Sequence, residues 1–218
     1  MHAWGKAVLL GAVVVVSVFS GLSNSTSSAA PHRVLLCGGD HRWDVKTLSD
    51  AVADDVRYDS PKRHTIKYLT GIPDAHVGTH TPRDPDGRHV ELTVYRVIGA
   101  ELYNVRIEED GDIHLVIQDK YERKMIVEFP NIKCKGAKDS DHMAEMMDAR
   151  DTLASLCGLG NWNTRTTRAS PKDLTGSASI EGVGFFDLPH GTPQLGVAPN
   201  NIELHPVLKF SAENCRLQ

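Results

Sequence analysis

Carboxylates and histidines that could bind a metal ion and activate water gather at two places in the chain. Residues 110–114 read Asp-Gly-Asp-Ile-His, and residues 203–205 read Glu-Leu-His. Carboxylate and imidazole groups are ligands for divalent cations, and both can act as a general base toward water. We therefore predict a site for a divalent metal ion (Mg²⁺, Ca²⁺ or Mn²⁺) beside a group that takes a proton from water. The metal ligands are assigned to Asp110 and Asp112, and the catalytic roles to His114, Glu203 and His205.

Basic residues that could hold a phosphate group lie elsewhere in the same half of the chain. Arg123 ends an expected turn, Lys124 begins the expected strand that follows it, and His190 lies in a loop rich in glycine and proline. Cationic side chains of this kind contact phosphate oxygens, so substrate binding is assigned to these three residues. Each motif also has a plainer interpretation. An acidic hairpin turn is usually only a solvated turn, and scattered basic residues usually only form a soluble surface.

The net charge limits the partners that the protein can have. The chain has 218 residues, with 24 Lys and Arg against 28 Asp and Glu, and a formal net charge of −4. This balance excludes a strongly basic nucleic-acid-binding protein. A polyanionic substrate such as nucleic acid would have to be held by a local basic patch or by bound metal ions.

The first thirty residues have the layout of a secretory signal peptide. Lys6 precedes an apolar run over residues 7–19, and small residues follow at 26–30. The run is shorter than the roughly 20 residues of a membrane span, so we expect cleavage and export, with an uncleaved membrane anchor as the alternative. No second apolar run exists, and we therefore expect a secreted, extracellular protein without membrane contact.

All four cysteines lie in the part of the chain that would be exported. An even number of cysteines in an oxidising compartment favours two disulfides, and three pairings are possible. We favour Cys134–Cys157, which would join both ends of a helical segment, and Cys37–Cys215, which would join the termini. A zinc site is the alternative, although no Cys-x-x-Cys pair is present.

The pattern of the chain changes at about residue 90. Residues 31–89 are polar and rich in turns, which indicates an N-terminal arm that wraps around the remainder. Residues 90–218 are expected to form a barrel domain, with Gly99 marking a bulge or bend in its first strand.

Strand-like runs cover 90–107, 112–118, 124–129, 177–186 and 202–210, and helical spacing covers 140–157. This order predicts a mainly β fold, a five-stranded OB-fold-like barrel with one helix between strands 3 and 4. An α+β sandwich is the alternative.

Alternation along the strands sorts the polar side chains by face. Ile113, Leu115 and Ile117 share the face that suits the core, and His114 points the other way. The same rule places Glu128, Glu203 and His205 on faces away from the core. Whether these four side chains meet depends on barrel geometry that alternation does not determine.

Several motifs carry a resemblance to a known group of proteins. They include Trp43-Asp44-Val45-Lys46-Thr47-Leu48-Ser49-Asp50, Met125-Ile126-Val127-Glu128-Phe129-Pro130 and the run from Gly196 to Leu208. Together they resemble an uncharacterised family of small secreted bacterial proteins. The resemblance covers most of residues 37–210 and implies a shared fold without an activity. The chain is also loosely similar to OB-folds of the staphylococcal-nuclease type, but it lacks the arginine and Asp-Thr-Pro-Glu arrangement of their catalytic site.

These observations predict a secreted, metal-dependent phosphodiesterase that acts on DNA or RNA as a nuclease. Two alternatives stay open. The protein could be a non-enzymatic OB-fold module that binds an oligonucleotide, an oligosaccharide or a protein. Alternatively, the polar face could be a metal-free structural network, and the binding surface would then be the arm.

Overall fold

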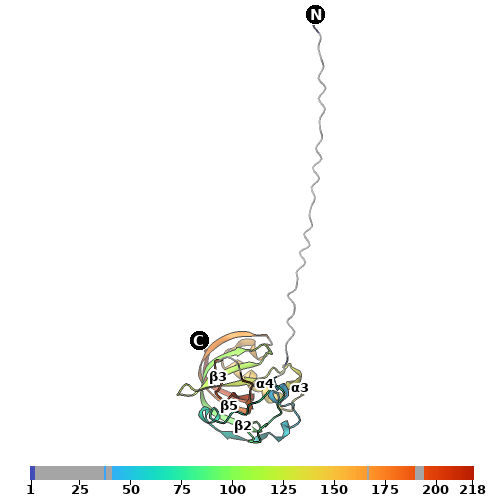
Figure 1. Ribbon diagram of the computed structural model, residues 1–218. Helices are drawn as coiled ribbons and strands as arrows, with labels where there is room; N and C mark the ends of the chain where they lie inside the picture. Colours follow the sequence, from blue (N-terminus) through green and yellow to red (C-terminus); the bar gives the residue numbers. More distant parts are fainter. Residues whose placement is uncertain (3–36, 38–40, 166, 190–193) are drawn as a thin grey trace. The chain divides into compact units, whose positions relative to one another are not determined.

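A six-stranded mixed β-sheet organises residues 34–218, which form one unit of the computed structural model (Figure 1). The structure describes residues 1–2, 37, 41–165, 167–189 and 194–218. The expected signal peptide, apart from its first two residues, and His190 lie outside the described residues. Within the described ranges, no helix is long and apolar enough to cross a membrane.

The strands are β1 (Arg57–Arg63), β2 (Thr93–Ile107), β3 (Ile113–Gln118), β4 (Lys124–Phe129), β5 (Ala169–Phe186) and β6 (Ile202–Leu217). The helices are α1 (Trp43–Lys46), α2 (Ile66–Leu69), α3 (Lys135–Asp139) and α4 (Met143–Leu156), with 3₁₀ turns η1 (Ala53–Asp55) and η2 (Gly160–Asn163).

Five of the strands close into a ring. The order in the sheet is β1-β2-β3-β4-β6-β5, and β2 pairs with β5 as well as with β3. Neighbours in the ring are antiparallel except β4 and β6, which are parallel. Ring closure depends on the length and bend of β2, whose register with β5 shifts around Gly99, a residue with a φ of 68°. Glycine adopts this left-handed conformation without steric cost. The shift agrees with the bulge or bend that the sequence predicted at Gly99.

The predicted mainly β architecture is confirmed, although the sheet has six strands. The extra strand, β1, comes from the arm and pairs with β2 in parallel. In addition, β5 begins at Ala169, whereas the sequence predicted a strand only from residue 177. Strand β6 extends to Leu217, whereas the predicted strand ended at residue 210. These extensions are mostly exposed and polar, so they lack the apolar alternation that marks a half-buried strand.

The main core lies between the ring strands and α4. Alternate residues of β3 and β4 are fully buried there, as predicted from their spacing. Helix α4 contributes Ala149 and Leu153, both with 0% exposure. A second, smaller apolar cluster joins Leu48 and Val56 of the arm to Val94 and Val183 of the ring. The arm therefore covers the outer face of β2 and β5.

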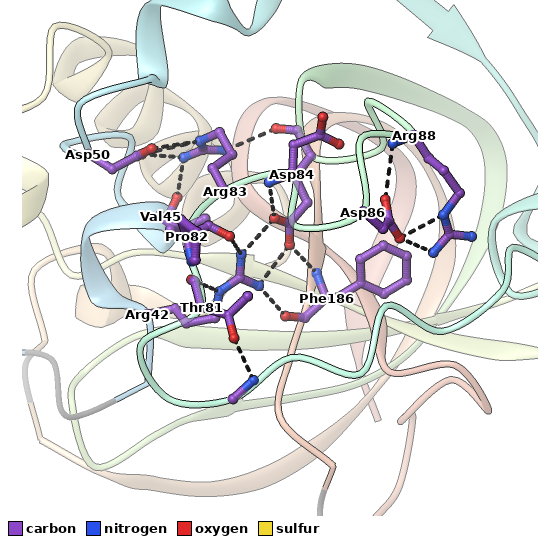
Figure 2. Close-up of polar contacts among 12 residues, drawn as sticks. Arg42, Val45, Asp50, Thr81, Pro82, Arg83, Asp84, Asp86, Arg88 and Phe186 are labelled. Atoms are coloured by element: carbon purple, nitrogen blue, oxygen red, sulfur yellow. Dashed lines mark hydrogen bonds and ion pairs between the residues drawn. The ribbon is translucent and has the colours of Figure 1, made fainter.

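A buried ion pair ties the arm to the end of β5. Figure 2 shows the Arg42 guanidinium donating to the Phe186, Thr81 and Pro82 carbonyls at 2.7, 2.8 and 3.1 Å. Its two Nη atoms also donate to the carboxylate of Glu91 at 2.8 and 2.6 Å, and Glu91 accepts the Phe186 N–H at 2.9 Å. Both charged side chains are fully buried, so their mutual pairing is required for stability. The Arg42–Glu91 pair holds Phe186 at the end of β5, and it therefore also fixes the position of the next residue, Asp187.

The prediction of two disulfides is confirmed, but the favoured pairing is wrong. The bonds are Cys37–Cys134 and Cys157–Cys215, with Cα–Cα distances of 5.2 and 4.7 Å. Helix α4 alone is about 21 Å long, so Cys134 and Cys157 at either end of the helical segment lie beyond disulfide reach. Because α4 packs along β6, its last turn places Cys157 beside Cys215 instead.

Candidate metal centre

A row of four polar side chains crosses the outer face of the ring, one from each of four neighbouring strands. Arg106 of β2 pairs with His114 of β3, and His114 pairs with Glu128 of β4. The parallel pairing of β4 and β6 then brings His205 next to Glu128. Residues that lie opposite one another on neighbouring strands point to the same face of the sheet, so these four side chains form one row. His114 Nδ1 lies 2.9 Å from Glu128 Oε1, and His205 Nδ1 lies 3.1 Å from Glu128 Oε2.

Asp112 joins this row from the turn before β3. Its Oδ1 accepts the Asn131 N–H at 2.6 Å, and the Asn131 amide donates to the Asp110 carbonyl at 2.9 Å. These bonds hold the Asp112 carboxylate in one orientation. Its other oxygen, Oδ2, lies 3.6 Å from His205 Nε2.

Asp112, Glu128 and His205 have the composition and spacing of a metal site. One donor atom from each residue lies within 4.8 Å of the other two, and all three residues are buried. Protein ligands bind divalent ions at about 2.0–2.6 Å, so donors on one ion lie at such mutual distances. The group could therefore hold one divalent ion.

Buried polar atoms without hydrogen-bond partners concentrate at this same place. Eight such side-chain atoms occur in the described part of the chain, and five belong to this cluster. They are Asp112 Oδ2, His114 Nε2, Glu203 Oε2 and both ring nitrogens of His205. Leaving a buried polar atom unpaired costs about 1–3 kcal/mol, and native structures contain few of them. Four of the five lie in ion pairs of His205 with carboxylate oxygens, at 3.1–3.8 Å and without hydrogen-bond geometry, and a bound cation could satisfy them.

A cavity of about 1040 Å³ opens onto the cluster. His114, Glu128 and Glu203 form part of its wall, whereas Asp112 and His205 lie behind them. Four cationic or potentially cationic side chains also line it: His41, Lys46, Arg106 and Arg168. Trp43, Leu188 and Leu195 add apolar surface to the cavity. A ligand in this cavity would meet both the carboxylates and the basic side chains.

Electrostatic coupling within the cluster is strong. Burial alone would raise the pKa of Glu128, but the hydrogen bond from His114 and the ion pair with His205 lower it well below its usual range. Burial alone would lower the pKa of His205, but Asp112, Glu128 and Glu203 raise it well above its usual range. Glu128 is therefore an ionised carboxylate, and His205 without a metal ion is an imidazolium.

Lys46 is the cation nearest to the carboxylates on the arm side. Burial would lower its pKa, but Asp187, Glu128 and Glu203 raise it above its usual range. Its Nζ lies 3.5 Å from Asp187 Oδ1. Lys46 does not offset all the carboxylates, and burial together with neighbouring carboxylates raises the pKa of both Asp110 and Glu203 to about 7.

The hydrogen bonds of His114 determine its tautomer. Glu128 is ionised and can only accept, so the 2.9 Å contact requires a proton on His114 Nδ1. Arg106 Nη2 lies 3.3 Å from the same nitrogen and is the weaker contact. A neutral His114 then has an unprotonated Nε2, which is the nitrogen without a partner.

The structure brings together most of the residues that the sequence singled out. Asp112, His114, Glu203 and His205 lie in the cluster, and Asp110 lies at the cavity wall. Arg123 and Lys124 do not lie there. They are at the opposite end of the β3–β4 pair, where Lys124 pairs with Gln118, about 13 Å along the strand from Glu128. Arg123 is ion-paired with Asp119 at 2.6 Å, and Lys124 lies over the ring of Tyr103.

Sequence reasoning missed the basic residues that reach the site. Arg106 ends a strand whose register was unknown, and Lys46 lies in the arm, far away in sequence. Lys46 stands in the motif that begins at Trp43, which carried a resemblance but gave this lysine no role. Glu128 was placed on the correct face without a role.

No protein-family model, curated protein or solved structure matches the chain. The function must therefore be inferred from the residues of the site.

Proposed function

We propose that the protein is a secreted, divalent-metal-dependent phosphodiesterase that cleaves nucleic acid. The observation that carries this proposal is the Asp112, Glu128 and His205 group, around which lie five buried polar atoms without hydrogen-bond partners, next to a cavity that Lys46, Arg106 and Arg168 also line. Negative charge at the floor calls for a cation, and Arg106 and Arg168, which pair with Glu108 and Glu109 in the wall, can also contact an anionic substrate. Phosphodiesters satisfy both features, since a metal ion and cationic side chains can share the phosphate oxygens.

The donor set favours one of the ions that the sequence suggested. Mg²⁺ and Ca²⁺ prefer all-oxygen sites, whereas imidazole ligands suit transition ions. The set contains two carboxylates and one imidazole. Mn²⁺ therefore fits better than Mg²⁺ or Ca²⁺, and Zn²⁺ is the closest competitor.

Asp112, Glu128 and His205 would hold the ion. When bound, a divalent ion lowers the pKa of a water ligand and polarises a phosphoryl oxygen. His114 stands beside the cluster with Nε2 free to take a proton from the attacking water. The Nδ1–H bond to Glu128 keeps this nitrogen oriented and stabilises the imidazolium that forms.

Arg106 and Arg168 supply the phosphate contacts that the sequence assigned to Arg123 and Lys124. Both arginines line the cavity, and Arg168 is 65% exposed at its side chain. Guanidinium groups bind phosphate in a bidentate manner, which stabilises the charge that grows on the transferring group.

The fold supports the same proposal. The ring order β2-β3-β4-β6-β5, the parallel β4–β6 pair and the helix between the third and fourth ring strands are features of an OB-type barrel. We infer that the ring is such a barrel. The two disulfides indicate an oxidising environment, which agrees with export.

The test measures metal binding and cleavage separately. We expect the mature protein to bind Mn²⁺ in calorimetry with one ion per chain, and to cut plasmid DNA or RNA in its presence. Asp112→Asn and Glu128→Gln keep the side-chain shape but remove a ligand charge, so affinity falls at least about tenfold and cleavage about a hundredfold.

The matched control is Asp54→Asn, which removes the same charge at an exposed position of η1 and leaves both readouts unchanged. Metal binding without cleavage of either nucleic acid would overturn the nuclease assignment. Absence of metal binding would overturn the metal centre itself.

A further inference from the structure

A second cavity, of about 780 Å³, lies where β1 and α2 meet the start of β2. The two cavities have no lining residue in common. Its size is within the range of about 300–1,000 Å³ that ligand pockets occupy. The chemistry proposed above does not use it.

The lining of this cavity is basic. Four of its described residues are Arg or Lys, two are His, and none is Asp or Glu. Among the described residues, Arg57, Lys62 and Lys67 have no ion-pair or hydrogen-bond partner for their side chains, and all three are exposed. The acids nearest in sequence to Arg57 and Lys62 are Asp55 and Asp59, and neither lines the cavity. Two further acids pair with lining residues, Asp86 with Arg88 (Figure 2) and Asp84 with His89. The cavity therefore has uncompensated positive charge, although the protein as a whole is acidic.

Aromatic rings stand beside these cations. His64 and Tyr68 are stacked with centroids 3.8 Å apart and an angle of 11° between planes, and Tyr95 lies 5.7 Å from His64. Tyr68 is 50% exposed, so one face of the stack is open to a ligand. Thr65 holds the stack in place, since its hydroxyl accepts the Tyr68 N–H at the start of α2.

We propose that this cavity binds single-stranded nucleic acid, with a base stacked on Tyr68 and the backbone phosphates held by Lys62, Lys67 and Arg57. Exposed cations next to a stacking platform are the two components that such sites combine. A sulfated polysaccharide would use the cations but not the aromatic pair, and this favours nucleic acid. The site goes beyond the proposed hydrolysis and requires no metal ion.

The test is fluorescence anisotropy of a fluorescein-labelled oligothymidylate at low salt, with EDTA present. Because EDTA removes any metal ion, failure of the metal centre cannot affect the result. We expect the wild-type chain to bind. The double variant Lys62→Ala/Lys67→Ala should bind at least about tenfold more weakly, and its slope of log K against log salt should be smaller by about 1.4, which corresponds to two phosphate contacts.

Stacking is tested at Tyr68. We expect Tyr68→Ala to weaken binding several-fold with an unchanged salt slope, and Tyr68→Phe to restore it. The matched control is Lys138→Ala/Lys209→Ala, which removes two exposed lysines that do not line the cavity and should bind within about twofold of wild type. All five substituted positions are exposed, so the variants keep the fold.

Three outcomes would overturn the proposal. The first is no binding of the oligonucleotide by the wild-type chain. The second is equal weakening in both lysine double variants, which would indicate nonspecific attraction. The third is binding of a heparin fragment that oligothymidylate does not displace, which would assign the cavity to a polysaccharide.

Discussion

Lys46 has the most unusual environment of any single residue in the site. It lies at the cavity with its side chain 11% exposed, and its charge is surrounded by carboxylates from β4, β6 and the end of β5. A buried cation among several carboxylates offsets their repulsion, so its removal leaves the negative charges uncompensated. A divalent ion held by Asp112, Glu128 and His205 would supply the same kind of compensation.

We therefore expect Lys46→Met to lower the free energy of unfolding of the metal-free protein by about 3 kcal/mol. Added Mn²⁺ should recover more stability in this variant than in wild type, because the ion replaces the missing charge. Thermal unfolding with EDTA and with Mn²⁺ measures both quantities. Lys209→Met, at an exposed position of β6, is the control and should change neither. Equal stability of Lys46→Met and wild type in EDTA would contradict this account.

At the scale of elements, alternation was enough to predict β3 and β4 and the faces of Ile113 and His114. These are local properties with a period of two. The register between strands is not local, and it decides that Arg106, His114 and Glu128 form one row. The position of Lys46 depends on how the arm packs on β2 and β5, and the disulfide pairing depends on how α4 packs on β6. Tertiary packing sets both, so the sequence pattern could not predict them.

Helix α4 acts on the site through one buried arginine. Arg150 is 1% exposed, and its guanidinium donates to six backbone carbonyls. Two of these carbonyls, those of Gly111 and Phe129, adjoin the metal-site residues Asp112 and Glu128, at 2.8 Å each. Burial outweighs the attraction of Asp112 and Asp110 and lowers the pKa of Arg150 to about 10, so it stays charged at neutral pH.

Arg150→Lys keeps the positive charge, but a lysine ammonium has only three N–H donors and cannot satisfy the six carbonyls. We expect the free energy of unfolding to fall by at least about 3 kcal/mol, since each unsatisfied buried carbonyl costs about 1–3 kcal/mol. Mn²⁺ affinity should also fall, because both ligand-bearing segments lose their support. Denaturant titration and calorimetry measure these effects, with the exposed Arg63→Lys as control. Unchanged metal affinity in a folded Arg150→Lys protein would show that α4 does not position the ligands.

At the scale of the whole molecule, the site makes stability depend on pH. A carboxyl whose pKa is higher in the folded than in the unfolded state destabilises the fold as pH rises from its unfolded to its folded pKa. Asp110 and Glu203, with pKa values of about 7 against ordinary values of 3.8 and 4.5, both act in this direction. The raised pKa of His205 adds a loss above about pH 6.5, whereas the lowered pKa of Glu128 acts only below pH 4.5.

The shifts within this cluster that operate between pH 5 and pH 8 therefore have the same sign, and among the described residues only the pKa of His64, which burial lowers, acts against them. We expect the protein in EDTA to lose stability over this range, by about 2 kcal/mol or more, which corresponds to a fall in Tm of several degrees. Mn²⁺ should reduce the loss, because a bound ion stabilises the ionised carboxylates and the neutral imidazole. Differential scanning calorimetry at pH 5, 6, 7 and 8 measures how Tm changes with pH. Glu203→Gln removes one of the two carboxyl groups whose pKa is raised, so the fall in Tm with pH should be smaller in this variant. A Tm in EDTA that rises steadily from pH 5 to pH 8 would mean that the carboxylates of this site are not held together as the structure places them.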